Sequence, residues 1–248
     1  MDNNKKLIRA YSSDAKEAKD KMEISKGMNQ FVWNLQYPEA EKIEGMILWN
    51  GVPGSIVAPP GDYFYKLKVG SDSAEGSFTV KADPNYMLTQ AGYEDQFNFL
   101  VKIKDKFNEV QQGIKDIRVL RMQMNDFTGR QQKDSIKEIK TIVDSINKQL
   151  TIIEETLYQT KAKSGQDVLN YPIRLNDKLS GLFDAANSGN MAPSKQVKEV
   201  FADLGRQCDE QLAKLKKIKE EDVAKLNQLI RDKAVPIIGL KKDEKEKE

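Results

Sequence analysis

The 248-residue sequence contains no histidine and only one cysteine. Without an imidazole there is no histidine general base, no triad that contains one, and no ordinary zinc ligand set. A single cysteine also excludes a disulfide within the chain. That residue, Cys208, lies in an amphipathic helical pattern four positions after Leu204, so we expect a small buried apolar side chain and not a reactive thiol.

The sequence also lacks a large net charge and a long apolar run. Its 40 Lys and Arg residues nearly balance its 38 Asp and Glu residues, which leaves a formal net charge of +2. Such a chain has no overall field that would attract nucleic acid or an anionic membrane. No segment is apolar for long enough to span a bilayer, and MDNNKKLIRAYSS lacks the apolar core of a signal peptide. We therefore expect no nucleic-acid partner and no membrane span.

The first third of the sequence reads as strands and turns. Four segments, KKLIRAYS, NQFVWNLQY, DYFYKLKV and EGSFTVKA, show the alternation of half-buried strands. The polar turn GSDSA joins the last two as a hairpin. This pattern predicts a small antiparallel, immunoglobulin-like β-sandwich over residues 1–84, with Phe31, Trp33, Leu35 and Tyr63 in its core.

The spacing of apolar residues becomes heptad-like after Asp83. A first long helix, with Thr89 as a plausible N-cap, and a second one should pack as an antiparallel pair joined by a turn around Gly129. The paired columns are Leu100, Phe107 and Ile114 with Ile103, Val110, Ile117 and Met124, and then Ile136, Val143, Leu150 and Leu157 with Ile139, Ile146 and Ile153.

Two further helices follow the pair. The loops KSGQDVLNYP and NSGNMAPS enclose a shorter amphipathic helix, and a last long helix begins near Ser194 and ends before Pro236. The sequence thus predicts an α+β chain in which residues 85–238 form a bundle of three long helices and one shorter helix. Residues 239–248 have the composition of a disordered charged tail.

Both tryptophans lie in GMNQFVWNLQYPEAEKIEGMILWNG, which also carries three glutamates. Glycosidic cleavage requires two carboxylates a few ångströms apart. However, Glu39, Glu41 and Glu44 share one loop among lysines, and the sequence gives no reason for a raised pKa at any of them. We therefore expect no catalytic residue in this chain.

The two indoles have different expected roles. Trp33 alternates with Phe31 and Leu35, which favours the core of the sandwich, although a sugar-stacking platform is the alternative. Trp49 lies in a loop that is longer than a sandwich turn requires, so binding of a ligand or partner, together with Tyr37 and Asn50, stands at even odds with a core position. The segment GVPGS is not a phosphate loop, and the turn acids lack calcium-loop spacing, so we expect no cofactor and no metal.

Several segments, in order, carry a resemblance to a known family. The tryptophan segment, APPGDYFYKLKVG and SFTVKADP, and later FNFLVKIKDKFNEVQQGIKDIR and YPIRLNDKLSGL, resemble the C-terminal region of large sortilin-like proteins with BNR-type propeller repeats, often labelled glycosyl hydrolases. Where that family tends to WD-L-RYPDA and Trp-Trp-Gly, this chain has Asn34, Gln36, Glu39 and Asn50. The resemblance implies a sandwich plus helical module that follows a β-propeller, and an exported protein, whether periplasmic, outer-membrane-associated or secreted.

These observations lead to two hypotheses about function. The leading one is a non-catalytic accessory or docking module whose partner is a β-propeller domain of the same parent protein. The alternative is a carbohydrate-binding module or part of a glycoside hydrolase. Because Asp2-Asn3-Asn4 reads as a hairpin turn into a strand, we also expect Met1 to lie at the end of an edge strand.

Overall fold

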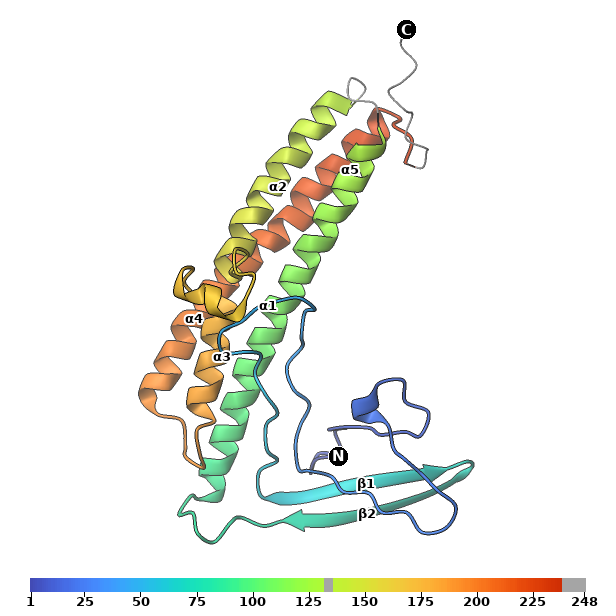
Figure 1. Cartoon of the computed structure of the whole chain (residues 1–248), viewed down its shortest axis with the longest axis vertical. Helices are drawn as coiled ribbons and strands as arrows, with labels where there is room; N and C mark the ends of the chain where they lie inside the picture. The colour runs from blue at the N-terminus through green and yellow to red at the C-terminus, as the bar shows by residue number, and fades with distance from the viewer. Residues whose placement is uncertain (132–135, 238–248) are drawn as a thin grey trace.

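The heptad-patterned part of the sequence forms a bundle of helices along the long axis of the molecule (Figure 1). In the computed structural model, which describes residues 1–131 and 136–237, the chain is α+β. Helix α1, Gln90–Arg130, begins where the Thr89 side chain accepts a hydrogen bond from the Gly92 amide. Helix α2 spans Lys137–Leu157. The residues of both predicted heptad columns are buried in each helix, which explains why two such long helices pack along their length.

The remaining helices close the bundle. Helix α3, Leu175–Ala186, packs on α1, and helix α4, Lys195–Lys217, begins after Ser194, as predicted, with the Ser194 hydroxyl accepting from the Val197 amide. A single turn, η3 (Gly165–Leu169), precedes α3. Among the described residues, no helix is both long and apolar enough to cross a membrane.

The last long helix contains an interruption that the apolar spacing explains. Helices α4 and α5 (Val223–Asp232) are joined by a π-helical segment, η4 (Ile218–Asp222), in which the Val223 amide bonds to the Ile218 carbonyl. The buried positions Leu215, Ile218 and Leu226 do not follow one heptad frame, because eight residues separate the last two. A π turn takes up the extra residue and keeps Leu226 facing the bundle.

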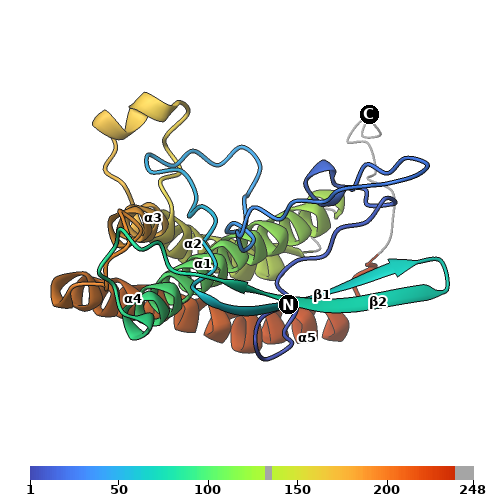
Figure 2. The same ribbon diagram turned by 90° about the horizontal axis from the view of Figure 1, so that it is seen from below.

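The first third contains one two-stranded antiparallel sheet within the part of the chain that the structure describes. Strand β1, Gly61–Val69, pairs with β2, Asp72–Val80, in a register that sets Tyr63 opposite Phe78 and Leu67 opposite Ala74. The predicted hairpin therefore forms, with a shorter turn in which Gly70 has a φ of 60° that glycine adopts without strain. The hairpin lies across one end of the bundle, and its tip projects beyond the helices (Figures 1 and 2). The single small hairpin is not the two-sheet sandwich that the alternation predicted.

The other two predicted strands, over residues 5–12 and 29–37, do not form. Leu35, inside the second segment, has a φ of 59°, which departs from strand conformation, and Lys5, at the start of the first, has a φ of 63°. Near Leu35 the chain bonds to itself: the Trp33 indole nitrogen donates to the Gln36 carbonyl at 3.1 Å, and the Gln36 amide donates to the Asn34 side chain. Strand-type pairing is limited to one antiparallel bridge between Gln36 and Val57, and local turn bonds take the place of the rest.

A long irregular segment connects this region to the bundle. Residues 37–58, which we call the strap, run out along the helices and back, with the Tyr37 amide bonded to the Ile56 carbonyl and the Ala40 amide to the Pro53 carbonyl. Ala40 and Ile56 are buried in the main core. The strap therefore belongs to the bundle in packing, although it precedes the hairpin in sequence. The charged tail predicted over residues 239–248 lies outside the described residues.

Candidate functional site

The body of the strap is fixed to α1. The Glu41 amide donates to the Asn108 side chain at 2.8 Å, and the Lys104 ammonium donates to the Pro38 carbonyl at 3.1 Å. The Glu41 carboxylate forms an ion pair with Lys115, which lies about two helical turns beyond Asn108 along α1. These contacts hold the strap parallel to the helix surface.

The tip of the strap is tied to two other elements. The Tyr158 hydroxyl, just after α2, accepts a hydrogen bond from the Ile47 amide at 3.1 Å. The buried Asp177 carboxylate, in the first turn of α3, accepts from the Trp49 amide at 2.8 Å and the Asn50 amide at 3.0 Å. Residues separated by more than 100 positions in sequence are thereby held within one hydrogen bond of each other.

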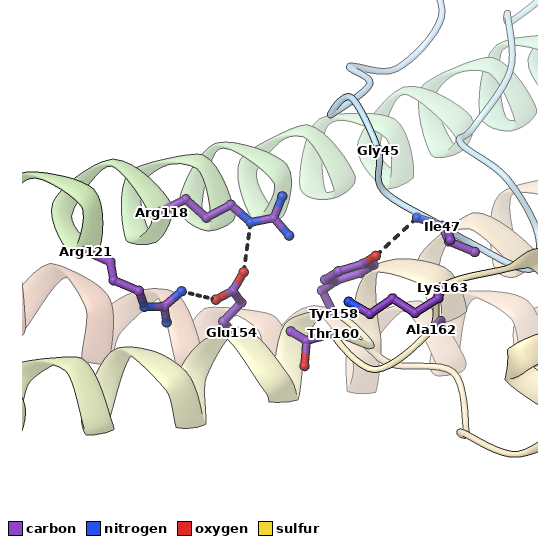
Figure 3. A pocket seen from close by; sticks show the side chains of 9 residues that line it. All are labelled: Gly45, Ile47, Arg118, Arg121, Glu154, Tyr158, Thr160, Ala162 and Lys163. Atoms are coloured by element: carbon purple, nitrogen blue, oxygen red, sulfur yellow. Dashed lines mark hydrogen bonds and ion pairs between the residues drawn. The ribbon is translucent and has the colours of Figure 1, made fainter. Parts of the chain in front are cut away.

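A surface hollow of about 410 Å³ opens where the strap tip, α1 and the end of α2 meet (Figure 3). Its size falls within the ~300–1,000 Å³ that small-molecule sites occupy. The walls are polar and come from three segments: Gly45 and Ile47 of the strap, Arg118 and Arg121 of α1, and Glu154, Tyr158, Thr160, Ala162 and Lys163 of α2 and the following loop.

One buried carboxylate organises the helical wall of this hollow. The Glu154 side chain is only 6% exposed and lies between two guanidinium groups. It accepts a hydrogen bond from Arg118 Nε at 2.9 Å and another from Arg121 Nη1 at 2.7 Å. Charge-assisted bonds of this kind offset the desolvation of the carboxylate. Because the lining contains one carboxylate, two guanidinium groups and the Lys163 ammonium, it carries a formal surplus of two positive charges.

The three residues proposed for ligand binding are not brought into one site. The Tyr37 ring packs edge-on against Phe97 of α1, with ring centroids 4.8 Å apart, and burial raises its pKa to about 12. The Asn50 side chain is bonded to Asp177. Trp49 is 55% exposed, so its ring is accessible while its backbone is held.

The strap glutamates are engaged at the surface. Glu41 pairs with Lys115, and Glu39 lies 3.5 Å from the Lys42 ammonium. Glu44 is exposed beside Gly45 and is not among the residues that line the hollow. Within residues 1–131 and 136–237, no group of three or more acidic or cysteine side chains could hold a metal ion.

The expected core residues of the first third have unequal surroundings. Tyr63 is buried, its hydroxyl donates to the Pro59 carbonyl at 2.7 Å, and burial raises its pKa. Trp33 is half-buried against the rings of Tyr63 and Phe78, and Leu35 is half-buried as well. Phe31, in contrast, is 49% exposed and contacts Tyr11, because no second sheet is present to cover it.

Sequence reasoning missed the residues that build the hollow and hold the strap. Four of these residues lie in or beside the two long helices, for which the sequence pattern indicated only the apolar columns: Arg118, Arg121, Glu154 and Tyr158. Glu154 follows the column residue Ile153 directly, so an acid at the border of a buried seam was the available signal. Asp177 is likewise an acid next to a buried position, since it lies in the first turn of α3 beside the buried Asn176.

Comparison of the sequence with models of protein families found no matching family. Searches among curated proteins and among solved structures likewise found no match.

Proposed function

We propose that this chain is a non-catalytic docking module whose partner is a β-rich neighbouring domain of an exported, glycosyl-hydrolase-like protein. The resemblance of the tryptophan segment to sortilin-like proteins makes a β-propeller the expected neighbour. The observation that carries the proposal is the exposed apolar face of the hairpin.

That face is formed by alternate residues of both strands. Tyr63, Tyr65, Leu67 and Val69 of β1 share it with Ala74, Gly76 and Phe78 of β2, because directly paired residues point to the same side. Trp33 covers only the end near Tyr63 and Phe78. Further out, Tyr65, Leu67 and Val69 are 49–67% exposed. A contiguous apolar patch on a projecting hairpin is typical of an interaction surface.

Apart from Phe64, whose ring lies under the Lys5 ammonium, the opposite face of the hairpin is polar, which gives the patch a definite direction. It carries Lys66 and Lys68 opposite Glu75 and Ser73, with Lys66 and Glu75 joined by an ion pair at 2.6 Å. One apolar and one polar face are typical of the outer sheet of a sandwich whose inner face is covered by other strands. We propose that the neighbouring domain supplies this cover and completes an immunoglobulin-like arrangement.

The free edge of β1 offers a second point of attachment. Met1 already forms one antiparallel rung there, since its amino group donates to the Phe64 carbonyl at 2.8 Å and the Phe64 amide donates to the Met1 carbonyl. The backbone groups of Lys66 and Lys68 point to the same side by alternation, and no described residue bonds to them. An extended segment added at this edge would lengthen the rung into a ladder.

Two adjacent substitutions test the docking face. Leu67→Ser removes apolar area from the face, whereas Lys68→Ser changes an exposed residue on the polar side of the same strand. Titration of a purified sortilin-like β-propeller domain should show binding that Leu67→Ser weakens about five- to tenfold, on the order of 1 kcal/mol of buried side chain. Lys68→Ser should change the affinity by less than about twofold.

The proposal fails if the propeller domain does not bind, or if both substitutions weaken binding equally. Light scattering after gel filtration tests whether a second copy of the chain covers the apolar face. Dimers of the wild-type chain that Leu67→Ser dissociates would show that a second copy, and not a propeller, covers the patch.

A carbohydrate-binding role is a second candidate because of Trp49. Its indole is 55% exposed, while its amide and that of Asn50 are fixed by the buried Asp177. An exposed ring on a fixed backbone suits stacking against the apolar face of a sugar, and little flexibility is lost on binding.

Tryptophan fluorescence tests this second role directly. In a Trp33→Phe variant only Trp49 emits, and titration with neutral oligosaccharides to about 10 mM should shift its emission if the ring stacks on sugar. The Trp49→Ala variant of the wild-type chain should lose the binding seen by calorimetry. An unchanged spectrum and no heat of binding would exclude this role.

A further inference from the structure

We propose that the hollow lined by Arg118, Arg121 and Lys163 is a binding site for a small molecule that carries a phosphate or sulfate group. This site lies on the bundle and does not depend on docking through the hairpin.

The donors of the hollow exceed what the protein itself uses. Arg118 bonds to Glu154 through Nε only, and no described residue bonds to its two terminal nitrogens. Figure 3 shows these nitrogens on the side of Gly45 and Tyr158, turned away from the carboxylate. The Lys163 ammonium likewise has no described ion-pair partner and lies near Thr160 and Tyr158 (Figure 3). A planar guanidinium and an ammonium that face one space match the oxygens of a tetrahedral anion.

The Tyr158 hydroxyl adds a neutral donor. It uses an oxygen lone pair to accept from the Ile47 amide, so its hydrogen is available to a ligand. The Arg118 guanidinium carbon lies 5.5 Å from the centre of the Tyr158 ring, which helps to orient both groups. The side chain of Thr160 supplies a further hydroxyl on the same wall.

The backbone around these donors is fixed before any ligand binds. The Asp167 carboxylate accepts from the Lys163 amide at 2.6 Å and from the Ser164 amide at 2.9 Å, in a capping box that starts η3. The Gln159 side chain donates to the Pro172 carbonyl at 2.9 Å and closes the loop that carries Thr160 and Lys163. Glu154 holds the two arginines. Preorganised donors reduce the entropy that binding costs.

The composition of the hollow indicates the kind of ligand. One paired carboxylate against three cations leaves a surplus that a dianion would neutralise. The volume of about 410 Å³ is larger than a free oxyanion needs, so we expect the anionic group to belong to a sugar-sized molecule.

Binding is tested with four probes at constant ionic strength, because exposed cations also attract anions nonspecifically. These are inorganic phosphate, inorganic sulfate, glucose 6-phosphate and uncharged glucose. Calorimetry and thermal unfolding of the full chain should show binding of at least one anionic probe, together with a higher Tm, and no effect of glucose. Saturation by phosphate alone would identify a free oxyanion, and at least tenfold tighter binding of glucose 6-phosphate would identify a phosphorylated organic ligand. Either result supports the site.

A matched pair of lysine variants locates the binding. Lys163→Gln removes one cation from the hollow and keeps the backbone bonds to Asp167, whereas Lys161→Gln removes an exposed cation that does not line it. We expect Lys163→Gln to weaken the binding of the anionic probes at least fivefold and Lys161→Gln to leave it within about twofold. Arg118→Gln should weaken the binding of the anionic probes further. If the Arg118→Gln protein does not fold, the comparison of Lys163→Gln with Lys161→Gln alone tests the site.

Two results would overturn the proposal. One is the absence of heat and of any change in Tm with every anionic probe at about 10 mM. The other is an equal effect of Lys163→Gln and Lys161→Gln, which would show that the anions respond to general surface charge and that the arginines serve only to hold Glu154.

Discussion

Asn50 and Asp177 are joined by three hydrogen bonds. The Asn50 amide donates to Asp177 Oδ1 at 3.0 Å, and the Asn50 side-chain nitrogen donates to the same oxygen at 2.9 Å and to the Asp177 carbonyl at 3.1 Å. The other carboxylate oxygen accepts from Trp49. One buried acid thus fixes both the position of the strap tip and the exposure of the indole beside it.

We predict that Asp177→Asn destabilises the protein by about 2–3 kcal/mol, because an amide offers a donor where the carboxylate accepts from two backbone amides. Urea unfolding followed by circular dichroism measures the change. Asp184→Asn, an exposed position on the same helix, is the matched control and should cost less than about 0.5 kcal/mol. Equal costs for the two variants would contradict a specific role for Asp177.

Gly181 gives a second test of the same contact. A Cβ at this position would lie 2.9 Å from the Asn50 side-chain nitrogen and 3.2 Å from its Cγ. Gly205, also inside a helix, has open space for a Cβ. Gly205→Ala should therefore stabilise the chain by about 0.5–1 kcal/mol through helix propensity. Gly181→Ala should show no such gain and should shift the fluorescence of Trp49, since Asn50 must move; a gain equal to that of Gly205→Ala would refute the close contact.

Glu154→Gln should affect stability and anion binding in opposite directions. Loss of the buried charge leaves two guanidinium groups without their shared partner, which we expect to cost about 1–3 kcal/mol. The same change raises the positive surplus of the hollow by one charge, and we expect this gain to exceed the loss of arginine positioning, so phosphate should bind more tightly. The exposed neighbour in Glu155→Gln should change neither quantity. A Glu154→Gln protein that is less stable and also binds phosphate more weakly would show that the carboxylate positions the arginines for the ligand and does not compete with it.

Alkaline pH should destabilise the fold because burial raises the pKa values of three acidic side chains, Cys208, Tyr37 and Tyr63. Burial raises the thiol pKa of Cys208 from 9.0 to about 12 and the phenol pKa of Tyr37 from 10.0 to about 12. The folded chain therefore holds these three protons more tightly than the unfolded chain does. The stability that this provides is complete below the unfolded pKa values and is lost as the pH rises to about 12.

The free energy of unfolding, measured in urea at several pH values between about 8 and 11, should fall from about pH 9 upward. Tyr37→Phe should make the decline shallower above about pH 10, and the exposed Tyr86→Phe should leave it unchanged. A decline of the same steepness in all three proteins would exclude a contribution from Tyr37.

The helices and the hairpin were predictable because their signals are periodic and local. Heptad columns identified α1 and α2, the predicted cap Thr89 accepts the hydrogen bond expected of it, and Ser194, near which the last long helix was predicted to begin, caps α4. The predicted turn at Gly129 came slightly early, since α1 continues to Arg130. The alternation over Asn29–Tyr37 misled because the segment pairs with another only at one antiparallel bridge, Gln36 with Val57, while the Asn34 side chain and the Trp33 indole bond within the segment.

The candidate site was much less accessible to sequence reasoning. Arg118 and Glu154 are 36 positions apart, and Ile47 and Tyr158 are 111 apart. No spacing rule connects such residues, because their proximity results from the antiparallel packing of α1 with α2 and from the course of the strap. The aromatic residues near Trp49 gave a recognisable sequence signal. The charged residues of the hollow gave none, because in the sequence they resemble ordinary solvated helix and loop residues.

The route of the strap has a consequence for biosynthesis. The strap tip can form its hydrogen bonds to Asp177 only after that residue is translated, 128 residues after Trp49. At about 5–20 residues per second, a ribosome needs roughly 6–25 s to cover that stretch. During this interval α1 and α2 are completed, but the strap tip has no carboxylate anchor until α3 emerges.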